Sequence, residues 1–123
     1  MTRDEVDEFV AAWIAAWNRR DVEAVVARFS DGVEFTSRVA AEVTGNATLQ
    51  GKEQVRQYWL DALEHITGVR FTLDYAIWDP ARSEVAIVFD REVDGRRARA
   101  CELLQFDESG LIVRGEGLRG AEL

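Results

Sequence analysis

The chain has 123 residues, 47% of them hydrophobic, which is the length of one ordinary domain that buries about two-thirds of the surface its unfolded form exposes. Fifteen basic residues against 23 acidic ones give a net charge of -8, so we expect neither a nucleic-acid partner nor a membrane partner. The N-terminus lacks the apolar run of a signal peptide, and no stretch of about 18 apolar residues occurs, so we expect a cytoplasmic protein.

Cysteine and histidine are scarce. Cys101 is the only cysteine and His65 the only histidine, so no intrachain disulfide can form and no Cys/His cluster is available for zinc. His65 lies near the end of a predicted helix, where interaction with the helix dipole explains it. We therefore expect no metal and no cofactor.

Two helices are predicted in the first thirty residues. Thr2 and Glu5 have the capping-box spacing that starts a helix over residues 3–18, and Asp21 caps a second, shorter helix. Apolar residues recur at spacings of three and four in both helices. These two stripes are Val6, Phe9, Val10, Trp13, Ile14 and Trp17, and then Val22, Val25, Val26 and Phe29.

The middle of the chain contains a strand, an irregular segment and a third helix. Residues 33–37 alternate as a strand does, whereas residues 38–51 show neither period and contain two glycines. We predict a loop there, with a short strand piece, as the candidate flap over a cavity. From Lys52 the helical period returns until Gly68 ends the helix. The stripe of this third helix is Val55, Tyr58, Trp59, Ala62, Leu63 and Ile66.

Everything after Gly68 is strand-like. The predicted strands are 69–78, 85–93, 97–106 and 111–119, separated by turn signals of which Asp94-Gly95 is the strongest. Helices followed by strands predict an α+β domain. We expect residues 1–123 to form one domain, a curved antiparallel sheet shaped as a cone and closed by three N-terminal helices, with a pocket where the helices stop short.

Glu102 is the main candidate for function. The period of two places it on the same strand face as Ala98, Ala100, Leu104 and Phe106. A carboxylate on the inward face of a sheet must find a partner, hold its proton or face a cavity. Our working hypothesis is a pocket acid with a raised pKa that donates a proton or hydrogen bond to a substrate.

The alternative for Glu102 is an ion pair with an inward-facing arginine, either Arg91 or Arg119. Such a pair favours the charged carboxylate, and it would bind a polar substrate group or orient a water. The aromatic stripes also have two interpretations, as core or as the wall of a site for a flat apolar ligand. The residues predicted to contact a ligand are Trp13, Trp17, Phe35, Ser37, Tyr58, Trp59, Phe89, Arg91 and Arg119.

Three segments together resemble a known superfamily. They read AAWNRRDVEAVVARFSDGVEFTS, LQGKEQVRQYWLDAL and DGRRARACELLQFDESGLIVRGE. Their order and content resemble the nuclear transport factor 2-like superfamily, and within it the SnoaL-like and ketosteroid-isomerase-like proteins. This resemblance covers nearly the whole chain and implies a cystatin-like fold. It also implies one of several activities, namely isomerase, polyketide cyclase, epoxide hydrolase, dehydratase or non-enzymatic binding.

Carrying over the catalytic residues of ketosteroid isomerase gives a mixed result. The protonated aspartic acid of that enzyme falls on Glu102, its tyrosine donor on Trp13 and its general base on Ser37. Only the acid is retained, so the resemblance does not imply classical ketosteroid isomerase activity. The aspartate base of polyketide cyclases has no counterpart in the last strand, which reads VRGEGLRG.

The resemblance also implies a homodimer. The outward face of the strand that carries Glu102 is mixed, with Cys101 and Leu103 amid arginine and glutamine, and sheets of this superfamily commonly pack against one another. Two functions stay open. The first is binding of a small, mostly apolar molecule, with acid-base isomerase, cyclase, dehydratase or hydrolase chemistry at Glu102. The second is a non-catalytic ligand-binding or dimerisation module with a filled pocket.

Overall fold

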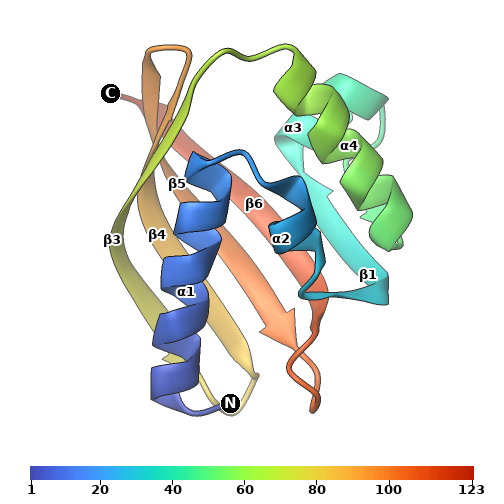
Figure 1. Cartoon of the computed structure of the whole chain (residues 1–123), viewed down its shortest axis with the longest axis vertical. Coiled ribbons are helices and arrows are strands. Elements are labelled where there is room, and N and C mark those ends of the chain that lie inside the picture. Colours follow the sequence, from blue (N-terminus) through green and yellow to red (C-terminus); the bar gives the residue numbers. More distant parts are fainter.

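Six strands form one curved sheet, and helices cover its concave face (Figure 1). The computed structural model describes residues 1–123. Strands follow one another across the sheet in the order β2-β1-β6-β5-β4-β3. The elements are α1 (Arg3–Asn18), α2 (Val22–Val26), β1 (Phe29–Ser37), α3 (Arg38–Thr44), β2 (Thr48–Gln50), α4 (Lys52–Glu64), β3 (Val69–Asp79), β4 (Glu84–Val93), β5 (Arg96–Phe106) and β6 (Ile112–Glu122).

The first two helices start at the predicted caps. The Glu5 N–H donates to Thr2 Oγ1 over 3.1 Å, the Thr2 N–H donates to Glu5 Oε1 over 3.0 Å, and Asp21 Oδ1 accepts from the Ala24 N–H over 3.0 Å. These bonds satisfy amide groups that a helix start leaves without partners. The apolar stripe of α1 is buried, and the helix lies against β3 (Figure 1). Both predicted helices are therefore confirmed.

The four long strands form an antiparallel meander. β4 joins β5 through Asp94 and Gly95, which both have positive φ values, as a tight hairpin turn requires. β1 pairs with β2 antiparallel but with β6 in parallel. The sheet is thus mixed rather than wholly antiparallel. After β1 the chain passes through two helices and the meander, and it returns as β6, which lies beside β1 and runs in the same direction. Strand alternation does not reveal the direction of such a distant partner.

Residues 38–51 differ most from expectation. The predicted loop is wrong for Arg38–Thr44, which form α3, so four helices rather than three cover the sheet. Ser37 Oγ caps this helix by accepting from the Ala40 N–H over 2.9 Å, and Gly45 ends it with a φ of 83°. Seven residues are too few to show a helical period, so the caps were the only signal. The predicted short strand piece is correct and is β2.

The core lies between the helices and the concave face of the sheet. An aromatic layer runs through it, with ring centroids 5.4 Å apart for Phe35 and Trp59, 5.1 Å for Trp59 and Trp17, and 5.4 Å for Trp13 and Phe89. Edge-to-face contacts at these distances stabilise the layer beyond simple burial. All five of these rings also border the cavity described below. No helix of the structure combines the length and the apolar character needed to cross a bilayer.

Candidate functional site

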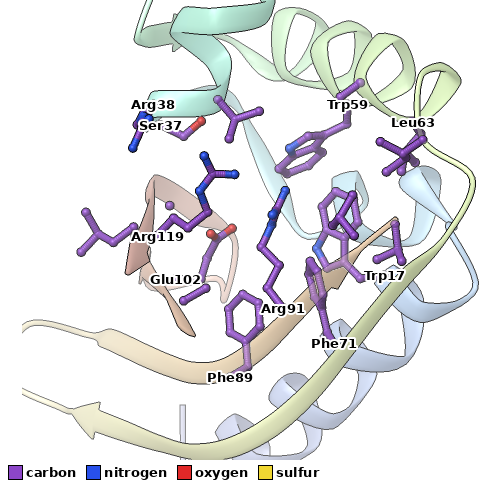
Figure 2. A pocket seen from close by; sticks show the side chains of 18 of the residues that line it. Trp17, Ser37, Arg38, Trp59, Leu63, Phe71, Phe89, Arg91, Glu102 and Arg119 are labelled. Carbon is purple, nitrogen blue, oxygen red and sulfur yellow. The ribbon is translucent and has the colours of Figure 1, made fainter. Parts of the chain in front are cut away.

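A cavity of about 150 Å³ remains between the helices and the open end of the sheet. Side chains from α1, α3, α4 and five strands line it, and most of them are hydrophobic. Figure 2 shows Arg91, Glu102 and Arg119 extending into one space, with Trp17, Trp59 and Phe71 on the side of α1 and α4 and Phe89 beside Glu102. All ten residues that the sequence predicts for the site border this cavity: Trp13, Trp17, Phe35, Ser37, Tyr58, Trp59, Phe89, Arg91, Glu102 and Arg119.

Glu102 occupies the centre of the β5 wall. The sheet register places it between Ile87 of β4 and Gly117 of β6, and its side chain is 9% exposed. It forms no hydrogen bond and no ion pair with the protein. Burial raises the pKa of its carboxyl group to about 8, although the positive charge of Arg91 acts in the opposite direction. A carboxyl group with that pKa is mostly protonated at neutral pH and is therefore a hydrogen-bond donor.

Gly117 makes room for this carboxyl group. A Cβ atom at position 117 would lie 3.0 Å from Glu102 Oε1 and 3.5 Å from the Ser37 Cβ atom. Gly115, two residues earlier on the same face of β6, avoids a contact of 2.9 Å with Phe35 Cδ1. The two glycines thus leave space for side chains of the neighbouring strands. The sequence analysis did not predict that these glycines make room for neighbouring side chains. Two glycines on the same inward face of one strand could have indicated it.

Two arginines reach the same part of the cavity from either side of β5. Arg91 comes from β4 and Arg119 from β6, and in Figure 2 both guanidinium groups extend into the space beside the Glu102 carboxyl group. Arg91 is half-buried, and its pKa is lowered first by burial and then by the charge of Arg119. Neither arginine forms the ion pair with Glu102 that the sequence offered as an alternative. Arg91 attracts the carboxyl group only at longer range.

Ser37 and Tyr58 form a small polar group on the opposite wall. Their hydroxyl oxygens lie 3.4 Å apart, and Ser37 already accepts from the Ala40 N–H as the cap of α3. Ser37 therefore has a structural role besides bordering the cavity. Burial raises the pKa of the Tyr58 hydroxyl group, so it stays neutral. The Trp17 indole N–H is buried without any hydrogen-bond partner, although the ring borders the cavity.

Several apolar wall residues were not singled out from the sequence. Phe71 of β3 contacts Trp13 and Trp17, each at 5.9 Å between ring centroids, and Phe89 at 4.7 Å. Strand alternation in β3 and the stripe of α4 carried the signal for most of them. Further lining residues of this kind include Val39, Ala62, Leu63, Ile66, Val69, Val93 and Ala100. Arg38, in the first turn of α3, also borders the cavity.

The raised pKa of Glu102 predicts a specific dependence of stability on pH. The folded protein keeps a proton up to about pH 8, whereas the unfolded chain releases it near the ordinary value of 4.5. This contribution to stability is complete below about pH 4.5 and is lost as pH rises through about 8. Glu102→Gln, which keeps a neutral side chain, should therefore match the wild type near pH 4 and exceed its free energy of unfolding by roughly 5 kcal/mol near pH 9.

Urea denaturation across that pH range measures the difference. Glu8→Gln is the matched control, because Glu8 is exposed on α1 and lies away from the cavity. The control should show no trend of this size. A free-energy difference between Glu102→Gln and the wild type that stays constant with pH would contradict the burial of an uncharged carboxyl group.

Comparisons with known proteins agree with this architecture. A crystal structure of a SnoaL-like protein of unknown function from Burkholderia thailandensis has a TM-score of 0.87 and 29% identity, with 98% of each chain covered. A protein with a cystatin-like fold from Methylobium petroleophilum has a TM-score of 0.78 and 21% identity, covering 98% of this chain and 79% of that one.

A third structure is a hypothetical protein from Catenulispora acidiphila with a ketosteroid isomerase-like fold, in complex with trimethylamine. Its TM-score is 0.71 and its identity 21%, covering 92% of this chain and 85% of that one. The search of curated proteins finds no match. The model of the SnoaL-like domain matches residues 10–115, which is most of the sequence. The chain therefore belongs to the SnoaL-like family, with the fold and superfamily that its sequence predicted.

Proposed function

We propose that the cavity binds a small, mostly apolar molecule and that Glu102 donates a hydrogen bond or a proton to an oxygen atom of that molecule. The observation that carries the proposal is a buried carboxyl group without a protein partner at the wall of an open space. Buried polar groups normally have a partner, so one that faces a cavity without a partner is typical of a binding site. A ligand oxygen would satisfy it.

The size of the cavity limits the ligand. A volume of about 150 Å³ corresponds to a space that holds a benzene-sized molecule in other proteins. The enclosed part of the site thus fits one ring or a short branched chain. Larger ligands would extend through the mouth between α3, α4 and the ends of the strands.

Proton donation is the chemistry that this arrangement favours. Glu102 is the only carboxylic acid that borders the cavity, and its pKa of about 8 keeps the proton available at neutral pH. Ser37, which occupies the general-base position of ketosteroid isomerase, has no histidine nearby and caps α3 instead. Of the reactions considered, dehydration and epoxide opening depend most on an acid at a departing or opening oxygen, and the proton lost by the substrate or by the attacking water would pass to solvent. Isomerisation and cyclisation would require a base from the substrate or from water.

Measuring ligand binding and turnover separately, in the wild type and in Glu102→Gln, tests the proposal. Thermal-shift screening with steroid-like, polyketide-like and terpenoid epoxide compounds should find ligands that raise Tm, since a ligand selective for the folded state stabilises it. Glu102→Gln still donates a hydrogen bond but transfers no proton. It should keep affinity within about tenfold and lower kcat by at least about 100-fold.

Glu8→Gln again serves as the control and should behave as the wild type. Unchanged turnover in Glu102→Gln would contradict the acid role. Ligand binding without any turnover in the wild type would instead favour the non-catalytic alternative. A complete lack of ligands across the panel would favour the module that does not bind small molecules.

We also propose that the outer face of the sheet binds a second copy of this chain. Apolar residues lie in rows across four strands, and Tyr75 and Ile77 of β3 are 50% and 57% exposed. The rows are Tyr75, Val88, Cys101 and Leu118, and then Ile77, Ala86 and Leu103. A two-fold axis through this face would bury the same apolar patch in both copies, as symmetric dimers do.

Sedimentation at micromolar concentration should give the mass of a dimer for the wild type. Ile77→Glu places a charge at the most exposed apolar position of the face, on the edge strand β3, and should yield a monomer. Leu60→Glu, at an exposed position on α4, should leave the dimer intact. A wild type that sediments only as a monomer would refute the dimer.

A further inference from the structure

Arg91 differs from the other half-buried arginines of the chain because it has no partner. Each of the others donates hydrogen bonds to carbonyl or carboxylate oxygens. Their partners are the carbonyl groups of Leu63, Ile66 and Thr67 for Arg20, the Gly110 carbonyl for Arg28, Glu23 and Glu53 for Arg56, and Asp74 and Asp90 for Arg99. Arg91 thus carries five donors with no acceptor among the residues around it.

The surroundings of Arg91 make its charge costly. Burial removes water from its guanidinium group, and the like charge of Arg119 adds repulsion, so both lower its pKa. The chain does not lack acids, since 23 acidic residues stand against 15 basic ones. Even so, the only acid in the cavity is Glu102, which keeps its proton at neutral pH. Of the three arginines that border the pocket, Arg38 forms an ion pair with Glu42, whereas Arg91 and Arg119 have no ion-pair partner.

The strands hold these groups around an open space. Arg91 lies opposite Ala98 in β5, and Arg119 lies opposite Ala100, so only methyl groups separate the two arginines along the sheet. Figure 2 shows both guanidinium groups and the Glu102 carboxyl group converging from this side. The Trp17 indole N–H, buried and without an acceptor beside the same cavity, adds a further donor. The polar part of the pocket thus contains mostly donors.

We infer that Arg91 and Arg119 bind the carboxylate group of an amphipathic organic acid whose apolar part packs on Trp17, Phe71 and Phe89. This inference rests on the proposed function and specifies the class of ligand. A planar carboxylate accepts two parallel hydrogen bonds from a guanidinium group, and such charged bonds are stronger than neutral ones. The protonated Glu102 carboxyl group does not repel the anion and can donate to it. The aromatic rings hold the remainder of the molecule away from water.

Matched pairs of acids and amides test the inference. The probes are benzoate with benzamide, naphthoate with naphthamide, and octanoate with octanamide, each titrated calorimetrically at neutral pH. At least one acid should bind about tenfold or more tightly than its amide, which has the same shape without the charge. Arg91→Gln and Arg119→Gln should each remove most of this preference. Arg91→Lys should keep part of it, because it retains a positive charge without the paired geometry.

Arg114→Gln is the control, since it removes the same charge from an exposed, outward-facing position of β6. It should leave the preference unchanged. Arg91→Gln should also melt at the wild-type temperature or above it without ligand, because it relieves an unpaired, crowded charge. A large drop in that melting temperature would indicate a merely structural arginine and overturn the inference.

The titrations separate this inference from the proposed function. Amides that bind as tightly as their acids would overturn the role of the arginines but leave a pocket for apolar molecules. An acid preference that survives in both Arg91→Gln and Arg119→Gln would also overturn it. If no acid and no amide binds, the proposed function fails together with the inference.

Discussion

The candidate site is built around one carboxyl group, that of Glu102, which is buried without a hydrogen-bond or ion-pair partner in the protein. Burying an ionisable group in this way costs free energy, and the cost is smallest when the group stays protonated. Glu102 meets that condition because its pKa rises to about 8. It lies on the same buried face of β5 as Ala98, Ala100, Leu104 and Phe106. Its position next to an open cavity is the basis of the proposed chemical role.

The rest of the fold keeps the space around Glu102 open. Gly117, directly opposite Glu102 on β6, has no side chain that would fill the space. Ala98 and Ala100, on the same face of β5 as Glu102, have only methyl groups. On the helix side, Trp17 of α1 and Trp59 of α4 pack edge to face against each other and border the cavity. Interiors are usually close-packed, so a space bordered by large rigid rings on one side and small residues on the other is a built feature.

Much of this was predictable from local sequence signals. Strand alternation alone placed Glu102 on the buried face, and caps and apolar stripes located α1, α2 and α4, because burial imposes a regular period on each element. The short helix α3 was missed because seven residues cannot show a period. The parallel pairing of β1 with β6 and the absence of a Glu102 ion pair depend on contacts between distant segments. Strand pairing and side-chain geometry decide both features, and neither can be predicted from a single segment of the sequence.

Membership of the SnoaL-like family establishes the fold of the chain, whereas the chemistry depends on the residues that line the cavity. The most direct test of the account is the titration of the Glu102 carboxyl carbon by NMR, assigned by loss of its signal in Glu102→Gln. In the ligand-free protein the account predicts a midpoint near pH 8. A midpoint near the ordinary value of 4.5 would show a solvated or ion-paired carboxylate and contradict it.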